Sequence, residues 1–334
     1  MVRLARAIQR KEKGFLYVDT HAGRGRYDLD KASTGDTQAR APEWPEGIGR
    51  LWGRADAPPE VADYLGLVRA FDLRHGNLGQ GPRFYPGSPR LAKAIARPQD
   101  RIELWEKHPD ECDALRDEFH GERRVSVHRA DGYAAIRACL PPTERRALVL
   151  IDPPFESQEE WQHIERAMDE AFRRFPGGTY AIWYPLSERV PAADYLGYLK
   201  SLGKPSFTTE LSLPGAGTGI AGCGLVTVNP PWKADDEARA IVGYLATVLC
   251  LGQEAQGSVR WLVPTCRISG RAGWTSSGGG LKMCLVQLTS SRGVARAVAF
   301  SAVSGLARKV GAYGVMVVAT TRATKKCTKK MKKR

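Results

Sequence analysis

Residues 147–155 read Ala-Leu-Val-Leu-Ile-Asp-Pro-Pro-Phe, an apolar run that ends in a carboxylate, two prolines and an aromatic ring. A run of five apolar residues is typical of a strand that is buried on both faces. Proline lacks the backbone N–H that a sheet needs, so the strand must end near Ile151. Ligands of open α/β sheets bind at the carboxyl ends of strands. The sequence therefore places Asp152 where a ligand would bind.

The residues after Ile151 suit the methylation of an exocyclic amino group, above all N6 of adenine. The lone pair of such an amine is delocalised into the ring, which makes it a poor nucleophile. The Asp152 carboxylate and a carbonyl of Pro153 or Pro154 could each accept one N–H and draw the nitrogen toward a tetrahedral geometry. The Phe155 ring offers a flat surface for the base. The alternative is a plain strand followed by a Pro-Pro turn.

Strands and helices alternate on both sides of this stretch, which predicts a mostly parallel, doubly wound sheet. The expected strands are 15–19, 101–106, 125–127, 147–151 and 178–184, with two late strands at 207–213 and 222–228. The expected helices are 59–74, a start at Ser88-Pro89, 110–119, 133–139, 158–174 and 192–202.

Three further motifs follow strands in the order of a methyltransferase cofactor site. The loop Asp19-Thr20-His21-Ala22-Gly23-Arg24-Gly25 follows the first strand, and its glycines would let the backbone approach a cofactor. Glu106 ends the second strand and could accept hydrogen bonds from two ribose hydroxyls. Asp131-Gly132 ends the third strand, where a carboxylate could bind the amine of an adenine. Each motif alone could also be an ordinary turn or a solvated acid.

Asn229-Pro230-Pro231-Trp232 competes with the Asp152 motif, because Asn-Pro-Pro-aromatic offers equally acceptable chemistry. We favour Asp152, since it directly follows the cofactor motifs as the fourth strand. The later motif falls after two extra strands, on the expected antiparallel edge, and we expect it to be structural or to shape the substrate pocket.

Composition limits the remaining possibilities. No apolar run is long enough to span a membrane, and the seven cysteines include no Cys-x-x-Cys pair, so we expect a cytoplasmic protein without disulfides or a metal site. Of the 50 Lys and Arg residues, 15 lie in 266–334, which contains no Asp or Glu. That leaves 35 basic against 36 acidic residues in 1–265, so any nucleic-acid contact of the body must be a local patch.

Several longer motifs together resemble the bacterial 23S ribosomal RNA adenine-N6 methyltransferase J family. They are Phe-Leu-Tyr-Val-Asp-Thr-His-Ala-Gly-x-Gly-x-Tyr (15–27), Phe-Tyr-Pro-Gly-Ser-Pro (84–89), Glu-x-His-Pro (106–109), Ala-Asp-Gly (130–132), Leu-Ile-Asp-Pro-Pro-Phe (150–155), Tyr-Ala-Ile-Trp-Tyr-Pro (180–185), Val-Asn-Pro-Pro-Trp (228–232) and Trp-Leu-Val-Pro (261–264). The resemblance covers about 15–265. It implies a Rossmann-like class I S-adenosylmethionine-dependent methyltransferase fold in residues 1–265, with a small helical insertion at about 30–90.

The resemblance also implies S-adenosyl-L-methionine as methyl donor, an adenine of 23S ribosomal RNA as acceptor, and a role in ribosome assembly as a monomer. The residues that would bind the cofactor are His21, Gly23, Ser88, Glu106, Asp131 and Gly132. Asp152 would be the catalytic proton acceptor within Asp152, Pro153, Pro154 and Phe155. Phe155 stands where the family usually has Tyr.

The two ends of the chain depart from the family pattern. The family begins with a segment like Tyr-Arg-His-x-Phe-His-Ala-Gly-Asn that this sequence lacks, so we expect either a start further upstream or an incomplete cofactor and RNA site. We expect 266–334 to be disordered or a non-native extension, or else a basic RNA-binding arm. Two other functions stay open: a DNA amino-methyltransferase, and a catalytically impaired, methyltransferase-like RNA-binding protein.

Overall fold

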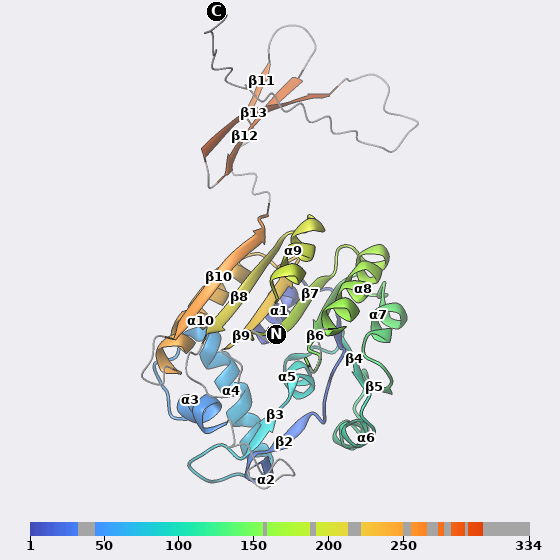
Figure 1. The fold of residues 1–334 in the computed structure, drawn as a ribbon, viewed down its shortest axis with the longest axis vertical. Helices are drawn as coiled ribbons and strands as arrows, with labels where there is room; N and C mark the ends of the chain where they lie inside the picture. Colours follow the sequence, from blue (N-terminus) through green and yellow to red (C-terminus); the bar gives the residue numbers. More distant parts are fainter. Residues whose placement is uncertain are drawn as a thin grey trace, which may run out of the picture. The chain divides into compact units, whose positions relative to one another are not determined.

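The computed structural model describes residues 1–32, 44–155, 159–187, 192–212, 222–249 and 255–265, and the backbone of 273–276, 282–290 and 293–302 (Figure 1). The chain divides into two compact units, Met1–Pro264 and Thr265–Arg334, and each is described by itself. No helix of the described residues is long and apolar enough to cross a membrane.

The first unit is built on an eight-stranded sheet in the order β10-β8-β9-β7-β6-β1-β4-β5. Its strands are β1 (Leu16–Asp19), β4 (Arg101–Glu106), β5 (Val125–Arg129), β6 (Ala147–Ile151), β7 (Thr179–Pro185), β8 (Ser206–Ser212), β9 (Gly222–Val228) and β10 (Gln256–Val263). The five strands from β5 to β7 run parallel, and β9 runs antiparallel between β7 and β8. The predicted mostly parallel sheet is confirmed.

Strand β10 was not among the expected strands. It pairs antiparallel with β8 and forms the edge of the sheet. Strand β9 lies between β7 and β8, inside the sheet, whereas we expected it at the antiparallel edge. The β10 segment has one short apolar run, Trp261-Leu262-Val263, and a short run of this kind predicts a strand only once a partner is known.

Helices cover both faces of the sheet (Figure 1). One apolar cluster joins the sheet to α1 (Val2–Gln9), α4 (Pro59–Arg74), α5 (Ser88–Ile95), α6 (Pro109–Glu118) and α10 (Ala234–Val248). A second cluster joins the other face to α7 (Ala134–Cys139), α8 (Glu159–Arg174) and α9 (Ala193–Ser201). Strand β6 is buried at every residue, because alternate side chains enter the two clusters.

An insertion follows β1 and returns the chain to α5. It contains β2 (Arg26–Asp28), α2 (Leu29–Ala32), a π-helical turn η1 (Pro45–Gly49), α3 (Arg50–Trp52), α4 and β3 (Phe84–Pro86). It is mainly helical, but β2 and β3 pair antiparallel. Strands of three residues are too short to give a recognisable pattern in the sequence. Part of the expected insertion, 33–43, lies outside the described residues.

The second unit contains a three-stranded antiparallel sheet of β11 (Gly273–Ser276), β12 (Lys282–Ser290) and β13 (Gly293–Ala302). Runs of Val, Leu and Ala suit strands in β12 and β13. That 266–334 is a disordered or non-native extension, or else a basic RNA-binding arm, stays a prediction. The lysine-rich end, 325–334, lies outside the described residues.

Asp72 fixes the end of the insertion and, through it, the start of α5. Its side chain is 2% exposed, and Oδ1 accepts hydrogen bonds from the backbone N–H groups of Arg83 and Phe84 at 3.2 and 2.6 Å. Oδ2 accepts one from Asn77 Nδ2 at 2.6 Å. The carboxylate therefore ties the end of α4 to β3, two residues before Ser88.

We expect Asp72→Ala to lower the free energy of unfolding by about 2–4 kcal/mol, because it removes the acceptor of two backbone N–H groups and of the Asn77 amide. Asp72→Asn keeps one acceptor oxygen and should lose less. Denaturant unfolding measures both, with the exposed Asp110→Ala as control. Equal stability of Asp72→Ala and Asp110→Ala would contradict this role.

Candidate active site

The sequence motifs meet at one edge of the sheet. Because β1, β4, β5 and β6 are parallel neighbours, their carboxyl ends lie together and bring four motifs to the same edge, His21 to Gly23, Glu106, Asp131-Gly132 and Asp152. Ser88 reaches this edge from α5, since the N–H of Gly87 donates to the carbonyl of Gly25 at 2.8 Å.

The loop after β1 requires its glycines. Gly23 and Gly25 have φ values of +60° and +78°, which side chains rarely adopt. Gly132 is constrained by space, since an added Cβ would lie 1.8 Å from the carbonyl oxygen of Thr20. The backbones of the first and third motifs therefore pack directly against each other, closer than any other residue type would allow.

Glu106 is held by the backbone on both sides. Its Oε2 accepts the N–H of Gly23 at 2.8 Å, and its Oε1 accepts the N–H of His108 at 2.7 Å. Each carboxylate oxygen can accept a second hydrogen bond. The side chain is half-buried, so two oriented acceptors remain available at the site, as a ligand with neighbouring hydroxyls requires.

His21 and Asp131 lie on either side of Tyr133. Nδ1 of His21 shares a 2.8 Å hydrogen bond with the hydroxyl of Thr20, and its ring meets the Tyr133 ring edge-on at 5.2 Å. Burial lowers the pKa of His21 to about 4, so the ring is neutral at pH 7. Asp131 is exposed and accepts the N–H of Tyr133 at 2.8 Å, which leaves its second oxygen facing solvent near Lys107.

Asp19 is a site residue that the sequence analysis did not single out. Its carboxylate is fully buried, and Oδ2 accepts the Tyr17 hydroxyl at 2.8 Å. Oδ1 makes no hydrogen bond among the described residues. The Ser88 hydroxyl and the His21 backbone N–H lie near the carboxylate and act to lower its pKa. Burial dominates and raises the pKa of Asp19 to about 6. The available signal was an acid at the end of a wholly apolar strand.

The Asp19 oxygen that lacks a hydrogen bond indicates whether this edge of the sheet could bind S-adenosylmethionine. Buried polar atoms in folded proteins almost always have a partner, and an exception points to a missing ligand or water. S-adenosylmethionine carries an ammonium, a sulfonium and a ribose diol. Asp19 supplies a buried anion and Glu106 supplies two acceptors, so the residues present match the charged and the hydroxyl groups of that cofactor.

Asp152 follows β6 on the same edge. The residue is exposed, yet nearby protein atoms desolvate its carboxylate and raise its pKa to about 7, and the charge of Asp19 adds to this rise. Pro153 is buried and Pro154 exposed. The half-buried Phe155 ring packs 4.7 Å from Trp161 and 5.9 Å from Trp183, so other aromatic rings hold it in place.

Asn229 lies at the opposite edge of the sheet, because β9 runs antiparallel to β7. Its side-chain amide donates to the carbonyls of Pro176 and Gly178 at 3.0 and 2.8 Å, and its φ is +50°. The side chain therefore braces the turn before β7. Its position separates it from the site that contains Asp152.

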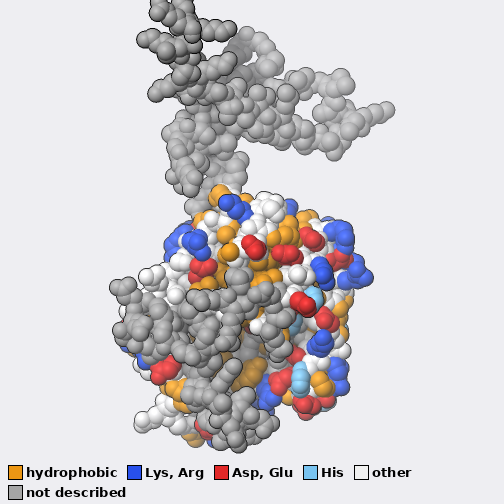
Figure 2. Space-filling model, viewed as in Figure 1, with side chains coloured by type: hydrophobic (Ala, Val, Ile, Leu, Met, Phe, Trp, Pro, Cys, Tyr) orange, Lys and Arg blue, Asp and Glu red, His pale blue; other side chains and the backbone are white. Residues whose placement is uncertain are grey.

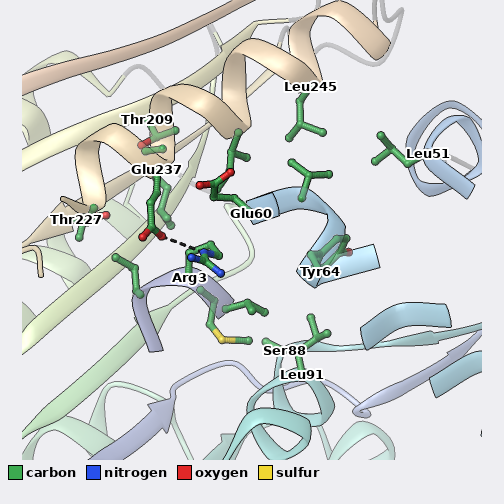
Figure 3. Close-up of a pocket in the computed structure, with 18 of the residues that line it drawn as sticks. Arg3, Leu51, Glu60, Tyr64, Ser88, Leu91, Thr209, Thr227, Glu237 and Leu245 are labelled. Carbon is green, nitrogen blue, oxygen red and sulfur yellow. Dashed lines mark hydrogen bonds and ion pairs between the residues drawn. The ribbon is translucent and has the colours of Figure 1, made fainter. Parts of the chain in front are cut away.

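A cavity of about 540 Å³ adjoins the site through Ser88 (Figure 3). Apolar side chains of α1, α4, α10, β8 and β9 line most of it, and an ion pair between Arg3 and Glu237 at 2.9 Å crosses one side. Asp152, Glu106 and Asp131 do not line this cavity, so it is distinct from the carboxylate-lined edge.

Comparison with known proteins gives consistent matches. The family model described as ribosomal RNA large subunit methyltransferase D, RlmJ, matches residues 12–263. Ribosomal RNA large subunit methyltransferase J of Escherichia coli is 37% identical over 261 residues, which cover 77% of this chain and 90% of that protein. The Haemophilus influenzae protein of the same name is 37% identical over 260 residues, with the same coverage of both chains.

A solved structure of a Legionella pneumophila protein has the same fold. It is 32% identical, with a TM-score of 0.69, and the match covers 78% of this chain and 92% of that one. The order β8-β9-β7-β6-β1-β4-β5, with β9 antiparallel between β7 and β8, is that of the class I methyltransferase fold, and β10 adds a second antiparallel strand at the edge. The matched span includes all ten site residues predicted from the sequence, and this chain therefore belongs to the RlmJ family of ribosomal RNA large subunit methyltransferases.

Proposed function

We propose that this protein transfers a methyl group from S-adenosyl-L-methionine to N6 of an adenine in 23S ribosomal RNA, with Asp152 as proton acceptor. One observation carries the proposal. Asp152, followed by Pro-Pro-Phe, lies at the sheet edge where the parallel strands β1, β4 and β5 bring Asp19, Glu106 and Asp131, and burial raises its pKa to about 7. The family membership supports ribosomal RNA as substrate.

The cofactor would be held by groups with distinct tasks. Glu106 would accept the ribose hydroxyls, and Asp131 with the tight backbone at Gly132 would hold the adenine. Asp19 and Ser88 would hold the methionine end, where a buried anion faces a cation. His21 is neutral at pH 7, so it would pack against the cofactor without repelling its positive charge. The bound cofactor would supply an electrophilic methyl group.

Asp152 would perform the proton chemistry. Its carboxylate would accept one N6 hydrogen and the carbonyl of Pro153 the other, which turns the nitrogen lone pair out of the ring. Asp152 would take the N6 proton as the nitrogen gains the methyl group that the bound cofactor supplies, with the neutral thioether of the cofactor as the leaving group. A base with a pKa near the working pH is suited to this, because about half of it is ionised and it still binds the proton well.

We expect Asp152→Ala to lower the single-turnover rate of methyl transfer to naked 23S ribosomal RNA at least about a hundredfold. Cofactor affinity should change far less. Asn229→Ala is the matched control: it removes two backbone contacts at the opposite edge, so it should lower thermal stability and leave the rate near that of the parent. A nearly unchanged rate in Asp152→Ala would contradict the assignment, and equal transfer to duplex DNA would contradict the choice of RNA.

The rate should rise with pH through about 7. Below its pKa Asp152 is protonated and cannot accept the N6 proton, whereas above it the carboxylate is ionised. Initial rates with both substrates far below saturation report the free enzyme, and should rise about tenfold per pH unit below 7 and level off above it. Asp19→Asn removes the second cause of the raised pKa, so its midpoint should lie at a lower pH. Rates that do not vary between pH 6 and 8 would exclude Asp152 as the titrating base.

Glu106→Ala should weaken S-adenosylmethionine binding by about 1–3 kcal/mol, the value of a charged hydrogen-bonding partner. Glu106→Gln keeps the shape and one acceptor oxygen, so it should lose less. Calorimetry measures both, with Lys107→Ala, a neighbouring exposed side chain, as control. Unchanged affinity in a folded Glu106→Ala protein would remove the ribose role.

A further inference from the structure

The opposite edge of the sheet, where the parallel strands begin, collects positive charge. Lys13 lies three residues before β1, and Arg146 and Arg124 directly precede β6 and β5. The carbonyl of Arg146 accepts the N–H of Leu16 at 2.9 Å, and that of Arg124 accepts the N–H of Ile102 at 2.9 Å. These cations therefore share one edge of the sheet. The five residues of β6 separate it by about 17 Å from the edge that contains Asp152.

Hydrogen bonds join part of this edge into one surface. The guanidinium of Arg146 donates to the carbonyls of Lys13 and Ile8. At the end of α1, Arg10 donates to the carbonyl of Trp232 at 3.1 Å. We call this surface the amino-edge patch, and it comprises Lys11, Lys13, Arg145, Arg146, Trp232 and Lys233.

The charge of the amino-edge patch is largely uncompensated. The carboxylates around it are engaged elsewhere: Asp100 pairs with Arg97, Glu144 with Arg101, and Glu237 with Arg3 and Arg10. Among the described residues, no ion pair within 4 Å reaches a side chain of the patch. Glu12, between the two lysines, offsets one of five positive charges. Burial lowers the pKa of Arg146, and the neighbouring Arg97 adds to this, whereas Asp100 opposes it.

Cations at the active edge are paired instead. Arg24 binds Glu111, Arg26 lies 3.4 Å from Glu118, and Arg129 binds Asp113. The site itself presents Asp19, Glu106, Asp131 and Asp152, which repel phosphates. An RNA substrate therefore gains little electrostatic attraction from the edge at which its base would react. Figure 2 shows basic and acidic side chains interspersed on the face displayed there, as expected for a body with almost no net charge.

Helix dipoles account for only part of the patch, because Arg146 donates to the carbonyl of Ile8 in the last turn of α1. The helices α1 and α7 also end at this edge, and cations stabilise the carboxyl end of a helix only within about its last turn. Lys13 lies four residues beyond the end of α1 at Gln9, and Arg145 lies six beyond the end of α7 at Cys139. Their positive charges are placed by the loops that lead into the strands.

Trp232 adds an aromatic surface to these charges. Its side chain is 66% exposed, although tryptophan is usually buried. An exposed ring among lysines and arginines is the combination with which proteins bind unpaired nucleic acid, since bases stack on the ring while cations neutralise phosphates. Duplex RNA keeps its bases stacked inside, so the ring suits a single strand.

We propose that the amino-edge patch binds a single-stranded RNA segment, with phosphates at Lys11, Lys13 and Arg145 and one base stacked on Trp232. Resting on the proposed function, this assigns the patch to a part of the ribosomal RNA away from the reacting adenine. The patch would supply affinity for the RNA, and the edge that contains Asp152 would supply the groups for methyl transfer.

The test compares two triple variants of the full chain with equal loss of charge. The patch variant is Lys11→Gln, Lys13→Gln and Arg145→Gln, whose side chains make no described hydrogen bond. The control is Arg54→Gln, Arg116→Gln and Arg166→Gln, three exposed cations elsewhere on the body. Binding of a 20-nucleotide single-stranded RNA is measured at several salt concentrations. The slope of log affinity against log salt should become about 2 units shallower in the patch variant alone.

Trp232 gives an independent readout. Trp232→Ala should weaken binding of the same RNA about five- to a hundredfold without changing the salt slope, and Trp232→Phe should recover most of the loss. With 23S ribosomal RNA, the patch variant should raise KM and leave the single-turnover rate at saturating RNA unchanged.

The outcomes separate this proposal from the methylation proposal. Equal salt slopes for the patch and control variants would overturn the RNA role of the patch. So would a patch variant that loses more affinity for duplex RNA than for single-stranded RNA. A parent chain that binds RNA through the patch but transfers no methyl group would leave the patch assigned and overturn the methylation proposal.

Discussion

Asp19 keeps a carboxylate at the end of β1 where no solvent reaches it. This burial is the constraint on which the active edge depends. Burial raises the pKa of Asp19 to about 6. The negative charge of Asp19 in turn contributes to the raised pKa of Asp152, which is about 7. Folding two such carboxylates close together is unfavourable in the free protein. A cationic ligand between them would relieve that cost, because opposite charge favours the ionised form of both.

The remaining architecture serves to hold these groups in place. The parallel order of β4, β1 and β6 brings the ends of three strands together. The glycine at 132 lets two of the loops touch, and Asp72 anchors the return of the insertion to Ser88. Glu106 in turn binds the loop after β1 by its backbone, so the residue proposed to bind the cofactor also fixes the loop that encloses it.

The two edges of one sheet carry opposite charge, and this division fits the two demands of the proposed reaction. The cofactor is a cation and the RNA is a polyanion, so no single surface attracts both. Parallel strands solve the problem, since all their amino ends lie on one side and all their carboxyl ends on the other. The nearly equal numbers of acids and bases in 1–265 conceal this separation.

The sequence by itself determined the order of the elements and the chemistry at the ends of the strands. Consecutive apolar residues predicted β6, which is buried on both faces, and the alternation of strands and helices predicted β4 and β5. The acids at the ends of these strands marked Glu106, Asp131 and Asp152. Only the tertiary structure decided that β10 forms the sheet edge, that β2 pairs with β3, and that Asn229 faces away from the site. It also revealed the unsatisfied oxygen of Asp19 and the line of cations from Lys13 to Arg146. Those features depend on which strands become neighbours and in which direction they run, and pairing between distant segments leaves no local trace in the chain.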